Sequence, residues 1–177
     1  MRTKLLLALL IPAMLLASDI RPGGGGSSGS SWSKYSLVAI ANGVNGCANA
    51  NGCWQVNGVL GANKAAGLTQ DVTLFQLPIK GKVTDWRMKT AVVFTGAATA
   101  VSGLGVTGSD VLFRAASYDL TVAVSDTNLA SGPTAGVGGG TAAAINVVAS
   151  LITTVNNVDQ LAAGAELDVW VQWSILP

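Results

Sequence analysis

The segment Glu166–Leu176, ELDVWVQWSIL, restricts the fold of this chain more than any other part of the sequence. Apolar residues occupy every second position, and polar residues occupy most of the positions between them. This two-residue period matches the alternation of side chains along a β-strand and not the 3.6-residue period of a helix. We therefore expect a half-buried strand with one apolar face, formed by Leu167, Val169, Val171, Trp173 and Ile175.

Other segments have the same character. YDLTVAV, residues 118–124, also alternates, with Leu120, Val122 and Val124 on the inward face. INVVASLITTV, residues 145–155, is rich in β-branched residues and lacks helix caps, which predicts a strand buried on much of both faces. Shorter strand candidates are SLVAIA, WQVNGVL, DVTLFQLPI and MKTAVVFT.

Breaks rich in Gly, Asn, Ser and Pro separate these strands. The spacing predicts an all-β fold, an antiparallel β-sandwich of jelly-roll-like form. The segments DQLAAGAE and GANKAAG are candidates for short helices that end at a glycine. GLGVTG and GVGGGT lack the strand–loop–helix context and the lysine of a phosphate-binding loop, so we interpret both as ordinary loops.

The composition argues against most kinds of catalysis. The chain contains no histidine, which removes the commonest general base and the commonest metal ligand. Its serines and threonines are not accompanied by a GxSxG motif. Charged residues make up 11% of the chain, against an average of about 25%. We expect a protein that is not an enzyme, with no catalytic residues, no metal and no cofactor. The net charge of +1 also gives no reason to expect nucleic-acid binding.

The N-terminal region divides into two parts. Arg2 and Lys4 precede the apolar stretch Leu5–Ala17, a pattern typical of a signal peptide, which we assign to residues 1–18. The stretch is short for a membrane span, so we expect none in the mature chain, although an uncleaved tether is the alternative. Residues 19–31 form a Gly/Ser-rich linker, and residues 32–177 form a single β-sandwich domain.

The stretch ANGVNGCANANGCWQVNG, residues 41–58, contains four Asn-Gly pairs and both cysteines. Asn-Gly is a strong signal for a hairpin turn, because both residues tolerate positive φ. Behind a secretory leader, Cys47 and Cys53 are expected to form a disulfide. Two interpretations stay open: a turn system held by a small ring, or a recognition loop with Trp54 as its aromatic anchor. The stretch has no carboxylate for calcium.

Two other tryptophans are candidates for an interface or for ligand contact. Trp86 lies in the basic segment PIKGKVTDWRMK, which could contact phosphate or an anionic glycan or could be a solvated strand face. Trp170 shares the polar face of its strand, where an exposed indole marks an interface or a platform for a sugar. The alternative is that another part of the same chain covers Trp170.

Residues 71–177 resemble a group of small β-sandwich proteins associated with the virions of tailed bacteriophages and prophages. The resemblance rests on three segments: VTLFQLPIKGKVTDWRMKTAVVFTG, AASYDLTVAVSDT and NVVASLITTVNNVDQLAAGAELDVWVQWSILP. It implies a structural or decoration-type virion protein that associates with itself and with other virion or surface proteins. It transfers no catalytic residue, because the motifs carry none.

These observations leave two functions. The first is a phage virion component that assembles through β-surfaces as a homo-oligomer. The alternative is a secreted or cell-surface binding module that contacts glycan or protein through exposed tryptophans. The expected location is the virion, or the periplasm or exterior if the leader is cleaved.

Overall fold

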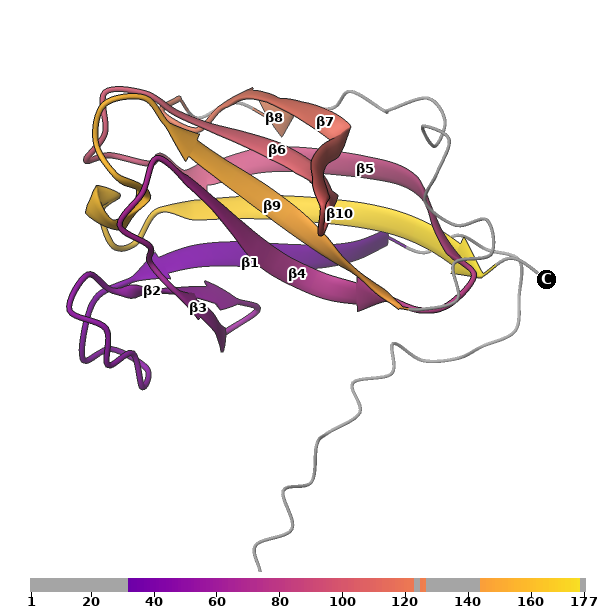
Figure 1. Ribbon diagram of the computed structural model, residues 1–177, viewed down its shortest axis with the longest axis horizontal. Helices are drawn as coiled ribbons and strands as arrows, with labels where there is room; N and C mark the ends of the chain where they lie inside the picture. The colour runs from indigo at the N-terminus through magenta and orange to yellow at the C-terminus, as the bar shows by residue number, and fades with distance from the viewer. Residues whose placement is uncertain (1–31, 123–124, 127–143, 176–177) are drawn as a thin grey trace, which may run out of the picture.

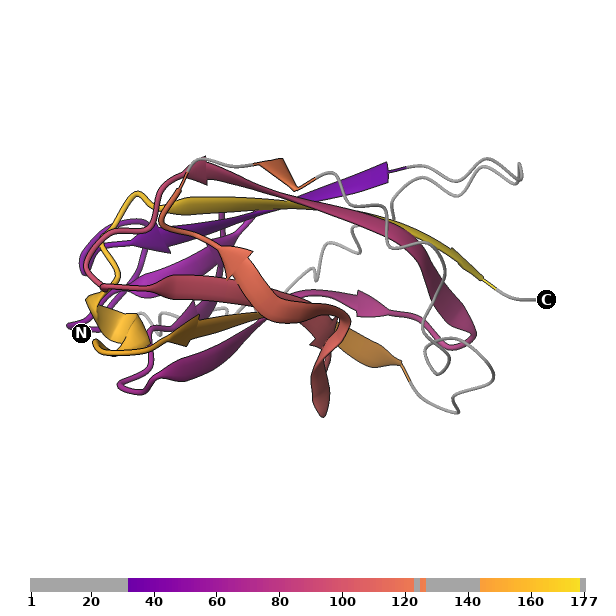
Figure 2. The same cartoon turned by 90° about the horizontal axis from the view of Figure 1, so that it is seen from above.

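The computed structural model describes residues 32–122, 125–126 and 144–175, and these residues form two antiparallel β-sheets packed face to face (Figures 1 and 2). The six-stranded sheet has the order β3 (Val59–Asn63), β2 (Cys53–Val56), β1 (Trp32–Ile40), β10 (Glu166–Ile175), β5 (Gly81–Val92) and β8 (Ser125–Asp126). The four-stranded sheet has the order β4 (Thr69–Leu77), β9 (Ile145–Thr153), β6 (Ala100–Val106) and β7 (Ser109–Asp119).

The hairpin β2–β3 is an addition at one edge of a simpler arrangement. Without it, eight strands remain in two sheets of four, β1-β10-β5-β8 and β4-β9-β6-β7. Among these eight strands, consecutive ones lie in different sheets except β6 and β7, which are neighbours in the four-stranded sheet, and this is the arrangement of a jelly roll. The expected all-β, jelly-roll-like sandwich is therefore confirmed.

Strand β10 lies in the middle of the six-stranded sheet, paired with β1 on one side and with β5 on the other. Leu167, Val169 and Val171 are fully buried against the four-stranded sheet, as their alternation predicts. The opposite face of β10 is less exposed than the sequence suggests, because Asp168 is only 5% exposed. Lys34 and Ser36 of β1 cover this carboxylate.

The segment GAATAVSGLGVTGSD contains a strand, so interpreting GLGVTG as a loop was wrong. Residues Ala100–Val106 form β6, which pairs with both β7 and β9. Its glycines are needed for contact with β7: a Cβ atom on Gly105 would lie 2.2 Å from the carbonyl oxygen of Ser109. A Cβ on Gly103 would lie 2.9 Å from a methyl carbon of Val111. These glycines allow the first half of β7 to fold over β6, instead of breaking the strand.

The fold of β7 over the four-stranded sheet explains why β9 is buried on both faces. Val147, Ala149 and Leu151 face the core, whereas Val148 and Ser150 face the other way and are also buried. The Ser150 hydroxyl donates a 2.9 Å hydrogen bond to Oδ2 of Asp110 in β7. The expectation for INVVASLITTV is confirmed.

Two other expectations about strands need correction. WQVNGVL is not one strand, because Asn57 and Gly58 adopt φ of 51° and 79° and form the turn between β2 and β3. The strand that contains Tyr118 ends at Asp119, with Leu120 buried and Val122 exposed, while Val124 lies outside the described residues.

The short helices are also different from those expected. DQLAAGAE overlaps only a 3-10 turn at Val158–Gln160, and GANKAAG begins as the end of β3. Within the described residues, no helix is long and apolar enough to cross a membrane.

Replacing Gly105 tests the packing of β7 on β6. Gly105→Ala places a methyl group against backbone atoms of Ser109 and Asp110, so we expect a loss of about 1–3 kcal/mol in the free energy of unfolding. Gly67→Ala is the matched control, because its Cβ would meet only the carbonyl oxygen of Thr69 at 3.8 Å. Urea denaturation measures both variants, and equal stabilities would contradict the role of Gly105.

Candidate functional site

A groove of about 820 Å³ opens between the two sheets, on the side where β3 and β4 are the edge strands. One wall is formed by β1 and the hairpin β2–β3, and the other wall is formed by β4. The lining residues are Ser33, Lys34, Tyr35, Val56, Asn57, Val59, Leu60, Gly61, Thr73, Leu74, Phe75, Gln76 and Trp173. We call this feature the β3–β4 groove. Its volume lies within the range of about 300–1,000 Å³ that is common for ligand sites, which makes it a candidate.

Aromatic rings from three strands line the groove. Tyr35 of β1 and Phe75 of β4 stack with their ring centroids 4.6 Å apart and their planes 8° apart, which links the two sheets. Trp173 of β10 also lines the groove and is partly buried. Burial raises the pKa of the Tyr35 phenol above its ordinary value of 10.0, although a hydrogen bond with Ser33 opposes the shift. The phenol is therefore neutral at physiological pH.

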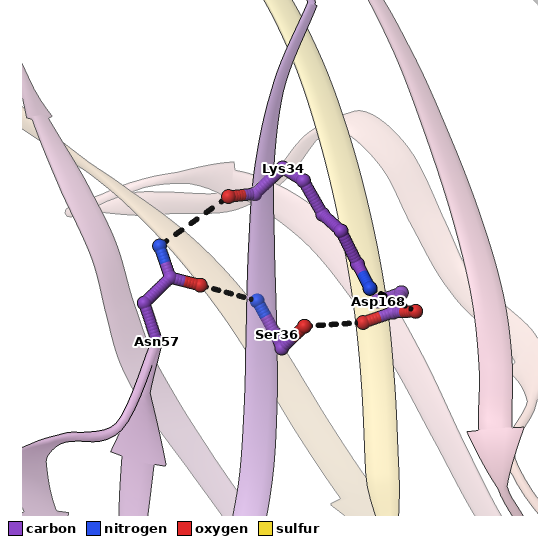
Figure 3. A network of polar contacts seen from close by, with 4 residues as sticks. All are labelled: Lys34, Ser36, Asn57 and Asp168. Carbon is purple, nitrogen blue, oxygen red and sulfur yellow. Dashed lines mark hydrogen bonds and ion pairs between the residues drawn. The ribbon is translucent and has the colours of Figure 1, made fainter. Parts of the chain in front are cut away.

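A polar network fixes the rim of the groove where β1 meets the β2–β3 turn (Figure 3). The Asn57 side chain bonds two backbone groups of β1: its Oδ1 accepts from the Ser36 N–H at 2.8 Å and its Nδ2 donates to the Lys34 carbonyl at 3.3 Å. On β10, the Asp168 carboxylate accepts from the Ser36 hydroxyl at 2.5 Å and pairs with the Lys34 ammonium at 2.8 Å. Among the described lining residues, Lys34 is the only charged one, and its charge is paired.

The groove also exposes aliphatic side chains. Val59 is 63% exposed and Leu60 is 43% exposed, both on the edge strand β3. Sequence reasoning missed this site because it treated the hairpin as one strand. The Asn57-Gly58 pair between apolar residues is a signal for the two-residue hairpin turn, but it does not reveal the groove, whose walls come from two sheets.

Trp170 lies on the outer face of the six-stranded sheet and is partly exposed. The Lys34 ammonium is 5.4 Å from the centre of its ring, and on the same face the Arg87 guanidinium is 4.5 Å from the centre of the Trp32 ring. These are cation–π distances. The basic side chains Arg87 and Lys89 of β5 are exposed on this face. This part of PIKGKVTDWRMK is therefore a solvent-exposed strand face.

The structure places the other two candidate tryptophans in the core. Trp54 is fully buried, and its indole N–H donates to Oε1 of Gln70 at 2.9 Å. Trp86 is 4% exposed, with the Arg114 guanidinium 5.6 Å from the centre of its ring. Because neither ring reaches the surface, we assign no ligand contact to Trp54 or Trp86.

The Asn-Gly stretch forms a compact turn system joined by the expected disulfide. Cys47 and Cys53 are bonded, with their Cα atoms 5.8 Å apart, and both are buried beside Ile40. Asn45 and Gly46 adopt positive φ of 48° and 81°, as the turn interpretation requires. In the chain-entropy account, a ring this short adds about 2 kcal/mol to the free energy of unfolding. The disulfide therefore stabilises one loop.

Lys64 links this turn system to the connection between β9 and β10. It is 4% exposed, and its ammonium donates to the Leu161 carbonyl at 2.6 Å and lies 5.4 Å from the centre of the Trp54 ring. Burial lowers the pKa of Lys64, and the nearby Asp159 carboxylate opposes the shift. Asp159 itself accepts a hydrogen bond from Asn51 at 3.0 Å. These contacts hold the turn system against the connection between β9 and β10, which is a structural role for Lys64.

The described residues contain no group of three or more His, Cys, Asp or Glu side chains that could hold a metal ion. No protein family, curated protein or solved structure matches this chain. The resemblance to phage virion proteins therefore stays a prediction, and the candidate site is defined by its geometry alone.

Replacing Lys64 tests whether burial lowers its pKa. A lowered pKa means that Lys64 contributes most to stability above pH 10.5, the ordinary lysine value, and that the contribution is lost as pH falls through the folded-state pKa. We expect the difference in unfolding free energy between the native chain and Lys64→Met to increase as pH rises toward 10.5. Denaturation at several pH values measures it, with exposed Lys89→Met as the control. A difference independent of pH would show that folding does not lower the pKa of Lys64.

Proposed function

We propose that the protein is a non-enzymatic structural or decoration-type component of a particle, and that it binds neighbouring protein through the β3–β4 groove. The observation that carries this proposal is the groove itself. Aromatic, aliphatic and uncharged polar side chains line it, it lies between the edges of β3 and β4 that no described strand pairs with, and the one charge among its described lining residues is paired. Such a surface favours another polypeptide over a charged small molecule.

The composition of β3 supports a role in association. Proteins usually protect an exposed strand edge with charged residues or proline. The β3 sequence, VLGAN, contains neither, and it exposes Val59 and Leu60. This edge is therefore suited to contact with a partner.

The setting in a phage particle is supported by the sequence resemblance over residues 71–177. A low content of charged residues and a jelly-roll fold are compatible with packing in a repeated assembly. The proposal accordingly includes self-association and a fixed copy number in particles.

The variant Val59→Asp/Leu60→Asp tests the groove. Two carboxylates there would have to be desolvated on association, so we expect a folded protein whose self-association and incorporation into particles fall at least tenfold. Light scattering and the stoichiometry of purified particles measure these quantities. The control is Val155→Asp, because Val155 is 69% exposed but does not line the groove. Unchanged association of the groove variant would overturn the proposal.

A second candidate function is glycan binding on the outer face of the six-stranded sheet. The observation that favours it is the partly exposed Trp170 ring, with exposed Arg87 nearby on the paired strand β5. An indole can stack on a sugar ring, and a guanidinium can bind a carboxylate of an anionic glycan.

The variant Trp170→Ala separates the two functions. Because Trp170 does not line the groove, our leading proposal predicts that this variant still self-associates. A glycan-binding module would instead be monomeric, and the substitution would abolish its binding to a glycan array. Loss of self-association in Trp170→Ala would place the interface on the outer face and contradict the groove.

A further inference from the structure

The four Asn-Gly pairs in residues 41–58 are held in the structure to different extents. An asparagine that precedes a glycine can form a cyclic imide when the glycine nitrogen attacks the side-chain amide carbon, because glycine has no side chain to hinder the approach. The attack needs a free glycine N–H, a free asparagine amide and a peptide bond that can rotate toward the side chain. The four pairs meet these three conditions unequally.

In two of the pairs, the glycine N–H is already bonded. The Gly43 N–H donates to the Cys47 carbonyl at 2.8 Å, and the Gly52 N–H donates to the Asn49 carbonyl at 2.9 Å. Gly52 is also buried, and a Cβ atom there would lie 2.3 Å from the Ile40 carbonyl oxygen, so its backbone has little space to rotate. Because these bonds must break before either nitrogen can attack, both pairs are protected.

The pair Asn57-Gly58 is protected through its side chain. These two residues form the turn between β2 and β3, with φ of 51° and 79°. The Asn57 Oδ1 accepts from the Ser36 N–H at 2.8 Å, and its Nδ2 donates to the Lys34 carbonyl at 3.3 Å (Figure 3). The amide cannot turn toward the Gly58 nitrogen without losing both bonds.

The pair Asn45-Gly46 has neither form of protection. Both residues are exposed. Within the part of the chain that the structure describes, neither the Asn45 amide nor the Gly46 N–H makes a hydrogen bond. The bond that closes this turn lies outside the pair, from the Cys47 N–H to the Val44 carbonyl at 2.9 Å.

The geometry of this turn also allows the peptide bond between Asn45 and Gly46 to rotate. Their φ values of 48° and 81° are the positive pair of a type I′ turn. Rotation of the central peptide gives a type II′ turn, which keeps the same closing hydrogen bond. In that form ψ of Asn45 is about −120°, and the Gly46 nitrogen lies beside the side-chain amide carbon. Gly46 tolerates the accompanying change of φ because it has no Cβ.

We propose that Asn45 is a modification site at which the folded protein deamidates spontaneously through a cyclic imide with Gly46. The Gly46 nitrogen gives up its proton and forms a bond to Cγ of Asn45, while the bond from Cγ to Nδ2 breaks and Nδ2 leaves as ammonia with that proton. Water then adds at Cγ to give aspartate, or at the backbone carbonyl carbon to give isoaspartate. One water is consumed, one ammonia is released, and –NH2 is replaced by –OH.

The modification adds a carboxylate to a stretch that has none and lowers the net charge of the chain by one unit from +1. Gly46 lies beside the groove residue Leu60, because a Cβ atom on Gly46 would be 3.6 Å from Cδ1 of Leu60. The charge therefore appears near the β3–β4 groove. The inference goes beyond the proposed function and does not depend on it.

The experiment uses the full chain with its disulfide intact, kept folded at mildly alkaline pH, where the glycine nitrogen loses its proton more readily. Reduction and brief digestion with trypsin at slightly acidic pH release residues 35–64 as one peptide that contains all four pairs. Fragmentation mass spectrometry then follows the replacement of –NH2 by –OH at each asparagine. We expect Asn45 to react at least about tenfold faster than Asn42, Asn51 and Asn57, because hydrogen bonds protect those pairs.

The reduced chain in urea is the control for local sequence, because all four pairs then lose their hydrogen bonds and should react at similar rates. Asn45→Gln is the matched variant, since it keeps an amide on the turn but would have to close a larger ring. The fast reaction should disappear in this variant, and the rates at the other three pairs should not change. A rate at Asn45 no higher than the rate at Asn57, or faster conversion at Asn42 or Asn51, would overturn the inference.

Discussion

Burial of the apolar face of β10 holds the two sheets together, and most of the remaining structure follows from it. Leu167, Val169 and Val171 are fully buried between β1 and β5 on the side that faces the second sheet. Complete burial of each such side chain contributes about 1.5–3 kcal/mol relative to an exposed state. Because alternate residues point to opposite faces, the same register places Asp168 and Trp170 on the outer face of the sheet.

The groove arises from a mismatch in length between neighbouring strands. Strand β1 spans nine residues, but β2 pairs with only four of them, so the hairpin β2–β3 stops short and no described strand lies beside residues 32–34 on that side. The Tyr35–Phe75 stack keeps the sheets in contact at this point. Where the hairpin ends, Asn57 bonds three backbone groups of β1: its N–H donates to the Ser36 carbonyl, and its side chain bonds the Ser36 N–H and the Lys34 carbonyl.

Buried charged side chains with bonded partners connect strands and loops of the two-sheet core. Asp168 is buried but has both an ammonium and a hydroxyl as partners, which compensates for its loss of hydration. Lys64 is buried with a backbone carbonyl and an aromatic ring as partners, and it connects the Cys47–Cys53 turn system to the segment that enters β10. Both arrangements are consistent with structural support around a rigid sandwich.

The sequence alone determined the β class, the half-buried strand that begins at Glu166, the double burial of β9 and the disulfide, because these depend on residue periodicity and on local spacing; the place of that strand in the middle of the sheet came from the structure. It did not reveal β6, since the reason for Gly103 and Gly105 is the close approach of β7 from another part of the chain. It also did not distinguish Trp54 and Trp86, which are buried, from Trp170, which reaches the surface. The groove belongs entirely to the tertiary structure: Tyr35, Phe75 and Trp173 come from three strands in two sheets, and only the packing of those sheets brings their rings together.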